Sequence, residues 1–189
     1  MKNTNETNDL LSWVKTLGFA VLLAVGLRYF IFTPTVVVGA SMMPTFENED
    51  KIIVDKIGPK LTNYDRFDVV VFEFNDNEDY IKRIIGLPGD HIEYKNDSLF
   101  INGEKYDEPY LDAYKGALTD SGKLTADFTL DAYLGETVVP EGHFFVLGDN
   151  RRKSLDSRDA SVGFIEQDKI IGKVRFVIYP IKRMQIIKD

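Results

Sequence analysis

The run of mainly apolar residues from Leu10 to Phe32 constrains the fold of this chain more than any other part of its sequence. A helix that crosses a membrane needs about 20 mostly apolar residues, and this run has that length. Lys15 and Arg28 stand near its ends, where long cationic side chains can extend to the lipid headgroups. The run predicts a transmembrane anchor helix at 10–32, between a short tail at 1–9 and a folded domain at 33–189.

A cleaved signal peptide and a buried core helix fit this apolar run less well than an anchor does. A cleaved signal peptide would begin with a basic region and end at a small-x-small cleavage site, and neither is present around the run. A buried core helix would need apolar partners, whereas the segments that follow it are strand-like. We therefore expect the run to remain part of the protein as an anchor.

The rest of the chain predicts many short strands and almost no helix. β-branched and aromatic residues recur in short segments bounded by polar turns, and Asn102-Gly103 between two of them indicates a tight hairpin. The expected strands are 35–38, 51–55, 69–74, 80–85, 91–94, 98–101, 104–106, 143–147, 162–165 and 170–179.

This pattern predicts a mainly β fold, with a β-barrel-like antiparallel domain behind the anchor helix. The stretch at about 107–139 is less regular and rich in Asp, Thr, Tyr and Gly. We interpret it as a small inserted cap in a core formed by 33–106 and 140–189.

Composition excludes several classes of function. The chain has no cysteine, which rules out disulfides, thiolate catalysis and cysteine-bound metal. Its two histidines, His91 and His143, do not form a paired metal-binding motif, so neither a metal nor another cofactor is expected. The net charge of −7 argues against nucleic acid as a partner.

The stretch from Val38 to Thr45 places Ser41 among glycine, alanine and methionine, just before Pro44. A serine hydroxyl is a weak nucleophile until a neighbouring base removes its proton. If Ser41 is a nucleophile, another part of the chain must supply that base.

Lys82 is one candidate for the base. On a strand, Tyr80, Lys82 and Ile84 share one face, and apolar neighbours would remove water from the lysine. Desolvation disfavours the charged ammonium and lowers its pKa toward neutrality. Arg83 would point to the other face, where a structural ion pair suits it. Taken alone, the pattern is more typical of a surface lysine on an edge strand.

A third polar constellation is the segment 148–158, which mixes Asp, Asn, Ser, Arg and Lys. Such a segment is usually a solvated charge run. This variety of residue types can also build a fixed hydrogen-bond network, and such a network could orient a neutral lysine amine.

Together these segments resemble the type I signal peptidases, membrane-anchored Ser-Lys proteases that cleave signal peptides from exported precursors. The family motif Ser-Met-x-Pro-Thr matches 41–45, and Lys-Arg-x-x-Gly-x-Pro-Gly-Asp matches 82–90. Gly-Asp-Asn-Arg-x-x-Ser-x-Asp-Ser-Arg matches 148–158. A further motif matches only in part at 64–70, because Phe67 stands where the family has glycine.

The resemblance implies roles for individual residues. Ser41 would be the nucleophile and Lys82 the general base. The base would be oriented and supported by residues of the third motif: Ser154, Asp149, Arg151, Asp156 and Arg158.

The oxyanion would bind near Gly39 and the backbone N–H of Ser41, as in the Gram-positive branch of the family. Val37, Met42 and Ile81 are our candidates for the shallow apolar pockets.

The resemblance also implies partners and location. The substrates would be signal peptides of secreted precursors with small residues at the first and third positions before the cut. The phospholipid bilayer would hold the anchor, with a cytoplasmic N-terminus and an extracytoplasmic catalytic domain in a bacterial cell membrane. We expect a monomer.

The sequence also leaves rival functions open. Repressor-type autoproteolytic Ser-Lys peptidases share the catalytic pair, and a membrane-tethered binding module without activity would need none of it. A Ser-His-Asp hydrolase would have to use His91 or His143, neither of which lies in a suitable motif. Ser12-x-x-Lys15 resembles the motif of penicillin-recognising enzymes, but it lies inside the apolar run.

Overall fold

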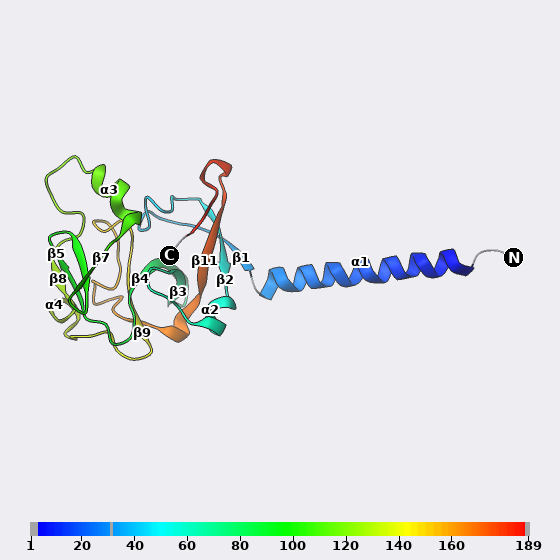
Figure 1. Ribbon diagram of the computed structural model, residues 1–189, viewed down its shortest axis with the longest axis horizontal. Helices are drawn as coiled ribbons and strands as arrows, with labels where there is room; N and C mark the ends of the chain where they lie inside the picture. Colours follow the sequence, from blue (N-terminus) through cyan, green and yellow to red (C-terminus); the bar gives the residue numbers. More distant parts are fainter. Residues whose placement is uncertain (1–3, 31, 188–189) are drawn as a thin grey trace.

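The computed structural model describes residues 4–30 and 32–187. Helix α1 (Thr4–Phe30) comes first and extends away from a β domain that contains all the strands (Figure 1). Strand β1 (Phe32–Val36) begins that domain.

The predicted transmembrane helix at 10–32 is wrong. In the part of the chain that the structure describes, no helix combines the length and the apolar character that crossing a membrane requires. Polar side chains interrupt the apolar run, since Ser12, Lys15 and Thr16 lie within α1 and the Thr16 hydroxyl donates to the Ser12 carbonyl at 2.9 Å. The predicted segment is also not one element, because α1 ends at Phe30 and Phe32 already belongs to β1.

The prediction of a mainly β, antiparallel domain is confirmed. The larger sheet has the strand order β1-β2-β11-β3-β4-β9-β10, with β12 added beside β11. Its strands after β1 are β2 (Lys51–Asp55), β3 (Val69–Asn75), β4 (Glu78–Gly86), β9 (His143–Leu147), β10 (Ile165–Glu166), β11 (Ile170–Tyr179) and β12 (Gln185–Ile186).

A smaller sheet with the order β7-β6-β5-β8 lies at the end of the domain away from α1 (Figure 1). Its strands are β5 (Ile92–Lys95), β6 (Ser98–Ile101), β7 (Glu104–Tyr106) and β8 (Phe128–Thr129). Asn102 and Gly103 join β6 to β7 with φ values of 52° and 83°, the paired positive angles of a type I′ hairpin.

The segment 107–139 is attached to this smaller sheet, because its strand β8 pairs with β5. The short helices of the β domain lie in the connections between strands. They are α2 (Gly58–Thr62), α3 (Asp112–Gly116), α4 (Leu130–Leu134) and the 3₁₀ turns at Pro109–Leu111, Gln167–Lys169 and Ile181–Arg183.

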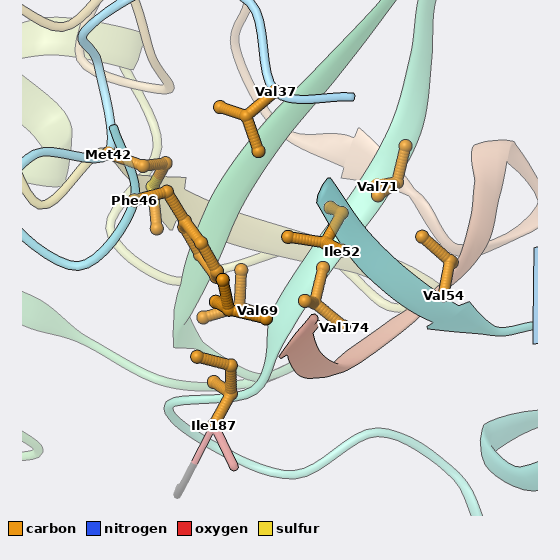
Figure 2. Close-up of a cluster of buried hydrophobic side chains, with 10 residues drawn as sticks. Val37, Met42, Phe46, Ile52, Val54, Val69, Val71, Val174 and Ile187 are labelled. Carbon is orange, nitrogen blue, oxygen red and sulfur yellow. The ribbon is translucent and has the colours of Figure 1, made fainter. Parts of the chain in front are cut away.

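The first four residues of β3, Val69 to Phe72, are buried on both faces of the strand, as a continuous apolar run suggests. Val69 and Val71 face one core cluster, whereas Val70 and Phe72 face another. The first cluster also contains Met42, which follows Ser41 directly, and Phe46 (Figure 2). The neighbour of the candidate nucleophile is therefore part of the hydrophobic core.

Candidate functional site

Ser41 lies on a tight turn that the core and the backbone hold in place. Met42 and Phe46, which follow Ser41 in this turn, are 2% and 0% exposed, and the Phe46 N–H donates to the Met42 carbonyl at 3.0 Å. Figure 2 shows both side chains directed into the core cluster around Val69. The turn therefore cannot shift without opening that cluster.

Gly39 shapes the entry to this turn. Its φ of +99° lies in a region that favours glycine, and its N–H donates to Oδ1 of Asn48 at 2.9 Å. The Gly39 N–H is thereby engaged and is not an oxyanion donor in this structure. The Ser41 N–H, in contrast, donates to no acceptor among the described residues.

Lys82 lies in the middle of β4, between β3 and β9, and is only 3% exposed. Its Nζ lies 3.0 Å from Oγ of Ser41 and 3.0 Å from the carbonyl oxygen of Ile81. Burial lowers the pKa of Lys82 from 10.5 to about 8, although the charges of Asp156 and Asp149 partly oppose the shift. A substantial fraction of this amine is therefore uncharged in mildly alkaline solution, which a proton acceptor requires.

Arg83, the next residue of β4, points to the opposite face of the strand, where it donates hydrogen bonds to Asp149 and to Phe67. Its Nε and Nη2 donate to the two carboxylate oxygens of Asp149 at 3.0 and 2.7 Å, and Nη1 donates to the Phe67 carbonyl at 2.9 Å. The hydroxyl of Thr45 also donates to Asp149. One buried carboxylate thus links the strand of Lys82 to the turn of Ser41.

Phe67 occupies the turn position at which the family motif has glycine, and its backbone has a positive φ. Its φ is +71°, in the left-handed region that favours glycine, and its ring lies 5.7 Å from that of Tyr110. The phenylalanine therefore adopts a backbone conformation that glycine reaches more readily, and its carbonyl receives Arg83.

The segment 148–158 forms a dense buried network. Arg151 is 2% exposed and donates to Glu108 and to the Tyr94 hydroxyl, at 2.6 Å in each case, and to the Gly148 carbonyl at 3.0 Å. Asp156 accepts two bonds of 2.8 Å from Arg158 and one of 3.0 Å from the Gly148 N–H.

The Ser154 hydroxyl makes no hydrogen bond to Lys82 in this structure. The structure gives Lys82 Nζ two hydrogen-bond partners, Ser41 and Ile81. The Ser154 hydroxyl is buried and, among the described residues, has no hydrogen-bond partner. It lies instead against Gly148, where an added Cβ would overlap both Ser154 Oγ and the Ser41 carbonyl oxygen.

Gly148 is therefore a position where one methyl group should disturb the site. Gly148→Ala is expected to lower the free energy of unfolding by about 1–3 kcal/mol, the usual range for overpacking a filled core. The measurement is urea denaturation. Gly116→Ala is the matched control, because nothing lies within 4 Å of a Cβ added there. Equal midpoints for the two variants would contradict the crowding seen at Gly148.

A cleft of about 650 Å³ runs beside Ser41 and Lys82. Residues 35–42 form one wall and 77–82 the other, and Lys153 and Leu155 also line it. The predicted pocket residues Val37, Met42 and Ile81 are all among the lining residues. Only shallow parts of Val37 and Met42 reach the surface, since they are 4% and 2% exposed.

Sequence reasoning missed several residues of the site. Lys153 and Leu155 line the cleft but occupy variable positions of the third motif. Glu108 contacts Arg151 from a distant segment. No local signal marks these positions, because they meet only after folding.

The two histidines lie elsewhere. His91 Nδ1 lies 2.7 Å from the Thr137 carbonyl, and His143 Nδ1 lies 2.8 Å from the Glu141 carbonyl. Neither residue lines the cleft beside Ser41. Within residues 4–30 and 32–187, no group of His, Cys, Asp and Glu side chains is arranged to hold a metal ion.

Known proteins are similar to this chain in sequence and in fold. Residues 10–179 match the family model described as "Signal peptidase, peptidase S26". "Signal peptidase I" of Bacillus caldolyticus is 52% identical over 164 residues, 87% of this chain and 88% of the relative. "Signal peptidase I S" of Bacillus subtilis (strain 168) is 44% identical over 186 residues, 97% of each chain.

The similarity extends to other genera. "Signal peptidase IB" of Staphylococcus aureus is 41% identical over 176 residues, 91% of each chain. The crystal structure of a signal peptidase I from Enterococcus faecalis V583 matches with a TM-score of 0.55 and 40% sequence identity, covering 59% of this chain and 96% of that one.

Proposed function

Because this chain belongs to the signal peptidase family, peptidase S26, we propose that it is a serine endopeptidase that removes signal peptides from exported precursor proteins. Ser41 is the nucleophile and Lys82 the general base. The observation that carries this assignment is the 3.0 Å separation between Ser41 Oγ and the buried Lys82 Nζ. A hydroxyl and a desolvated amine at this distance can transfer a proton directly.

The reaction is acyl transfer in two halves. Neutral Lys82 takes the Ser41 proton while Oγ attacks the scissile carbonyl, and the oxyanion that forms faces the Ser41 N–H, which no acceptor among the described residues occupies. The ammonium of Lys82 then protonates the leaving amine, so the C–N bond breaks and an ester to Ser41 remains. Lys82, neutral again, activates a water molecule that hydrolyses this ester and restores the serine.

The cleft supports an extended peptide as substrate. Its two walls, 35–42 and 77–82, include Ser41 and Lys82 themselves. The shallow surfaces at Val37, Met42 and Ile81 suit small side chains at the first and third positions before the cut. Signal peptides with such residues fit this description. We place the reaction at the extracytoplasmic face of the cell membrane, where exported precursors emerge.

The test is cleavage of a purified precursor followed by mass spectrometry of both products. We expect one cut, directly after the small residue at the end of the signal peptide. Changing that residue from Ala to Trp should lower kcat/KM by at least about 10²-fold, because a shallow pocket rejects bulk by steric overlap. Cleavage at unrelated sites, or indifference to the Trp substitution, would overturn the proposed function.

A further inference from the structure

Asn150 fixes the backbone on both sides of the candidate nucleophile. Its side-chain Nδ2 donates to the Ala40 carbonyl at 3.0 Å, and its backbone N–H donates to the Ser41 carbonyl at 2.9 Å. Asn150 is 4% exposed, so water does not compete freely for these bonds. Two successive peptide planes of the Ser41 turn are therefore held by one residue of a distant loop.

The bond to Ala40 has a consequence for Ser41. The Ala40–Ser41 peptide is trans, so the carbonyl of Ala40 and the N–H of Ser41 point in opposite directions in one rigid plane. The Ala40 carbonyl accepts the Met43 N–H at 3.2 Å within the turn and Nδ2 of Asn150 at the shorter distance of 3.0 Å. By adding this second donor, Asn150 helps to set the direction of the Ser41 N–H. That N–H is the backbone donor of the nucleophile, and no acceptor among the described residues uses it.

Tyr114 determines which way the Asn150 amide faces. Its hydroxyl donates to Oδ1 of Asn150 at 2.8 Å, from helix α3 in the 107–139 segment. If the amide turned over, Oδ1 would face the Ala40 carbonyl oxygen and the two acceptors would repel each other. The tyrosine hydroxyl therefore stabilises the orientation in which Nδ2 faces Ala40.

We propose that Asn150 is a positioning residue that presets the Ser41 N–H to bind the oxyanion, and that Tyr114 holds Asn150 in the orientation this requires. The inference rests on the proposed function, and it gives the 107–139 segment the role of orienting Asn150 through Tyr114. Neither residue touches the substrate. Both act through the peptide plane between Ala40 and Ser41.

The first test is the kinetics of Asn150→Ala. Complete loss of one oxyanion donor typically lowers kcat by about 10²–10³-fold, and a donor that is only misaligned should lose less, about 10- to 100-fold. We expect kcat and kcat/KM to fall together, because the interaction is made in the transition state. The pH at half-maximal activity should not move, since Lys82 Nζ has no bond to Asn150.

Inhibitor affinity distinguishes a misaligned oxyanion donor from a general disturbance of the site. A peptide aldehyde forms a tetrahedral adduct with Ser41, whereas the corresponding peptide alcohol binds without one. Asn150→Ala should weaken the aldehyde by the same factor as kcat/KM and leave the affinity for the alcohol within about threefold. Equal weakening of both compounds would show a merely structural role and overturn the proposal.

Tyr114→Phe supplies a second, milder variant that keeps the ring. It should lower kcat about three- to tenfold, and it should add nothing in the Asn150→Ala background, because Tyr114 acts through Asn150. Tyr133→Phe is the matched control, because this partly exposed tyrosine of α4 does not line the cleft beside Ser41. Additive losses in the double variant would contradict the proposed link.

Failure of this inference can be told apart from failure of the proposed function. If wild type cleaves precursors and Ser41→Ala does not, the proposed function stands, and full activity of Asn150→Ala and Tyr114→Phe then refutes the positioning role alone. If Ser41→Ala still cleaves, the proposed function itself fails.

Discussion

Alanine at either Ser41 or Lys82 is expected to lower precursor cleavage by at least about 10⁴-fold, with the double variant no worse than either single one. The two groups lie 3.0 Å apart and share one proton transfer, so removing either removes the same step. Lys82→Arg should be as inactive as Lys82→Ala, because a guanidinium cannot be deprotonated in a protein. The measurement is single-turnover cleavage of a purified precursor.

The pH dependence provides an independent check on the same pair. The pKa of Lys82 is lowered to about 8 by burial, and only the neutral amine can accept the Ser41 proton. Wild-type kcat/KM should therefore rise as pH increases, reach half its maximum near pH 8 and then level off. A rate that falls over this range would show that the charged form is the active one.

Lys82→Met distinguishes loss of the base from loss of the fold. It has nearly the same shape and removes a buried amine, so activity should vanish while the melting temperature stays the same or rises. In wild type, unfolded Lys82 keeps its proton up to about pH 10.5 and folded Lys82 loses it near 8. Wild-type stability should therefore rise with pH between these values, and the variant should lack that rise. Retained cleavage by Lys82→Met would remove lysine from the mechanism.

Asp149→Ala is expected to produce the largest loss of stability of any single substitution considered for this protein. Asp149 is 0% exposed and accepts two of the three bonds that the buried Arg83 guanidinium donates, together with the bond from the Thr45 hydroxyl. Removing one partner of a buried ion pair costs about 3–5 kcal/mol, because the other charge is left without compensation. For a chain of this size that is a fall in melting temperature on the order of 10 °C, measurable by calorimetry.

The control is Asp120→Asn, which breaks an exposed pair with Arg152. Water replaces that interaction readily, so the melting temperature should hardly change. A second outcome concerns activity. Since Asp149 links the turn of Ser41 to the strand of Lys82, cleavage should fall even at temperatures where Asp149→Ala remains folded. Similar melting temperatures for Asp149→Ala and Asp120→Asn would show that burial of the Arg83 pair contributes little.

Much of the site was predictable because its functional groups lie in three short motifs, each contiguous in the sequence. The stretches 41–45, 82–90 and 148–158 identify a serine, a lysine on an apolar strand and a polar loop without any knowledge of their positions in space. The antiparallel β character and the hairpin at Asn102-Gly103 were equally accessible, since alternation and turn chemistry are local properties.

The anchor helix shows where local reasoning failed. The apolar run from Leu10 to Phe32 has the length of a membrane span, yet α1 ends at Phe30, β1 begins at Phe32, and polar residues lie within the helix. A count of apolar residues does not register where a helix stops or how polar side chains are spread along it. The close packing of Ser154 against Gly148 was not accessible from the sequence either, because it arises only in the folded chain.

By itself, the sequence determined which functional groups this protein can use: one alcohol suited to attack, one lysine on an apolar strand and no thiol. Only the tertiary structure determined that Lys82 is buried, with Nζ 3.0 Å from Ser41 Oγ. It also determined that Asn150, Tyr114 and Asp149 form a hydrogen-bond network next to the Ser41 turn. The physical reason is distance along the chain. Asn150 and Ala40 are 110 positions apart, and only the packing of the sheets and loops brings such partners within hydrogen-bond reach.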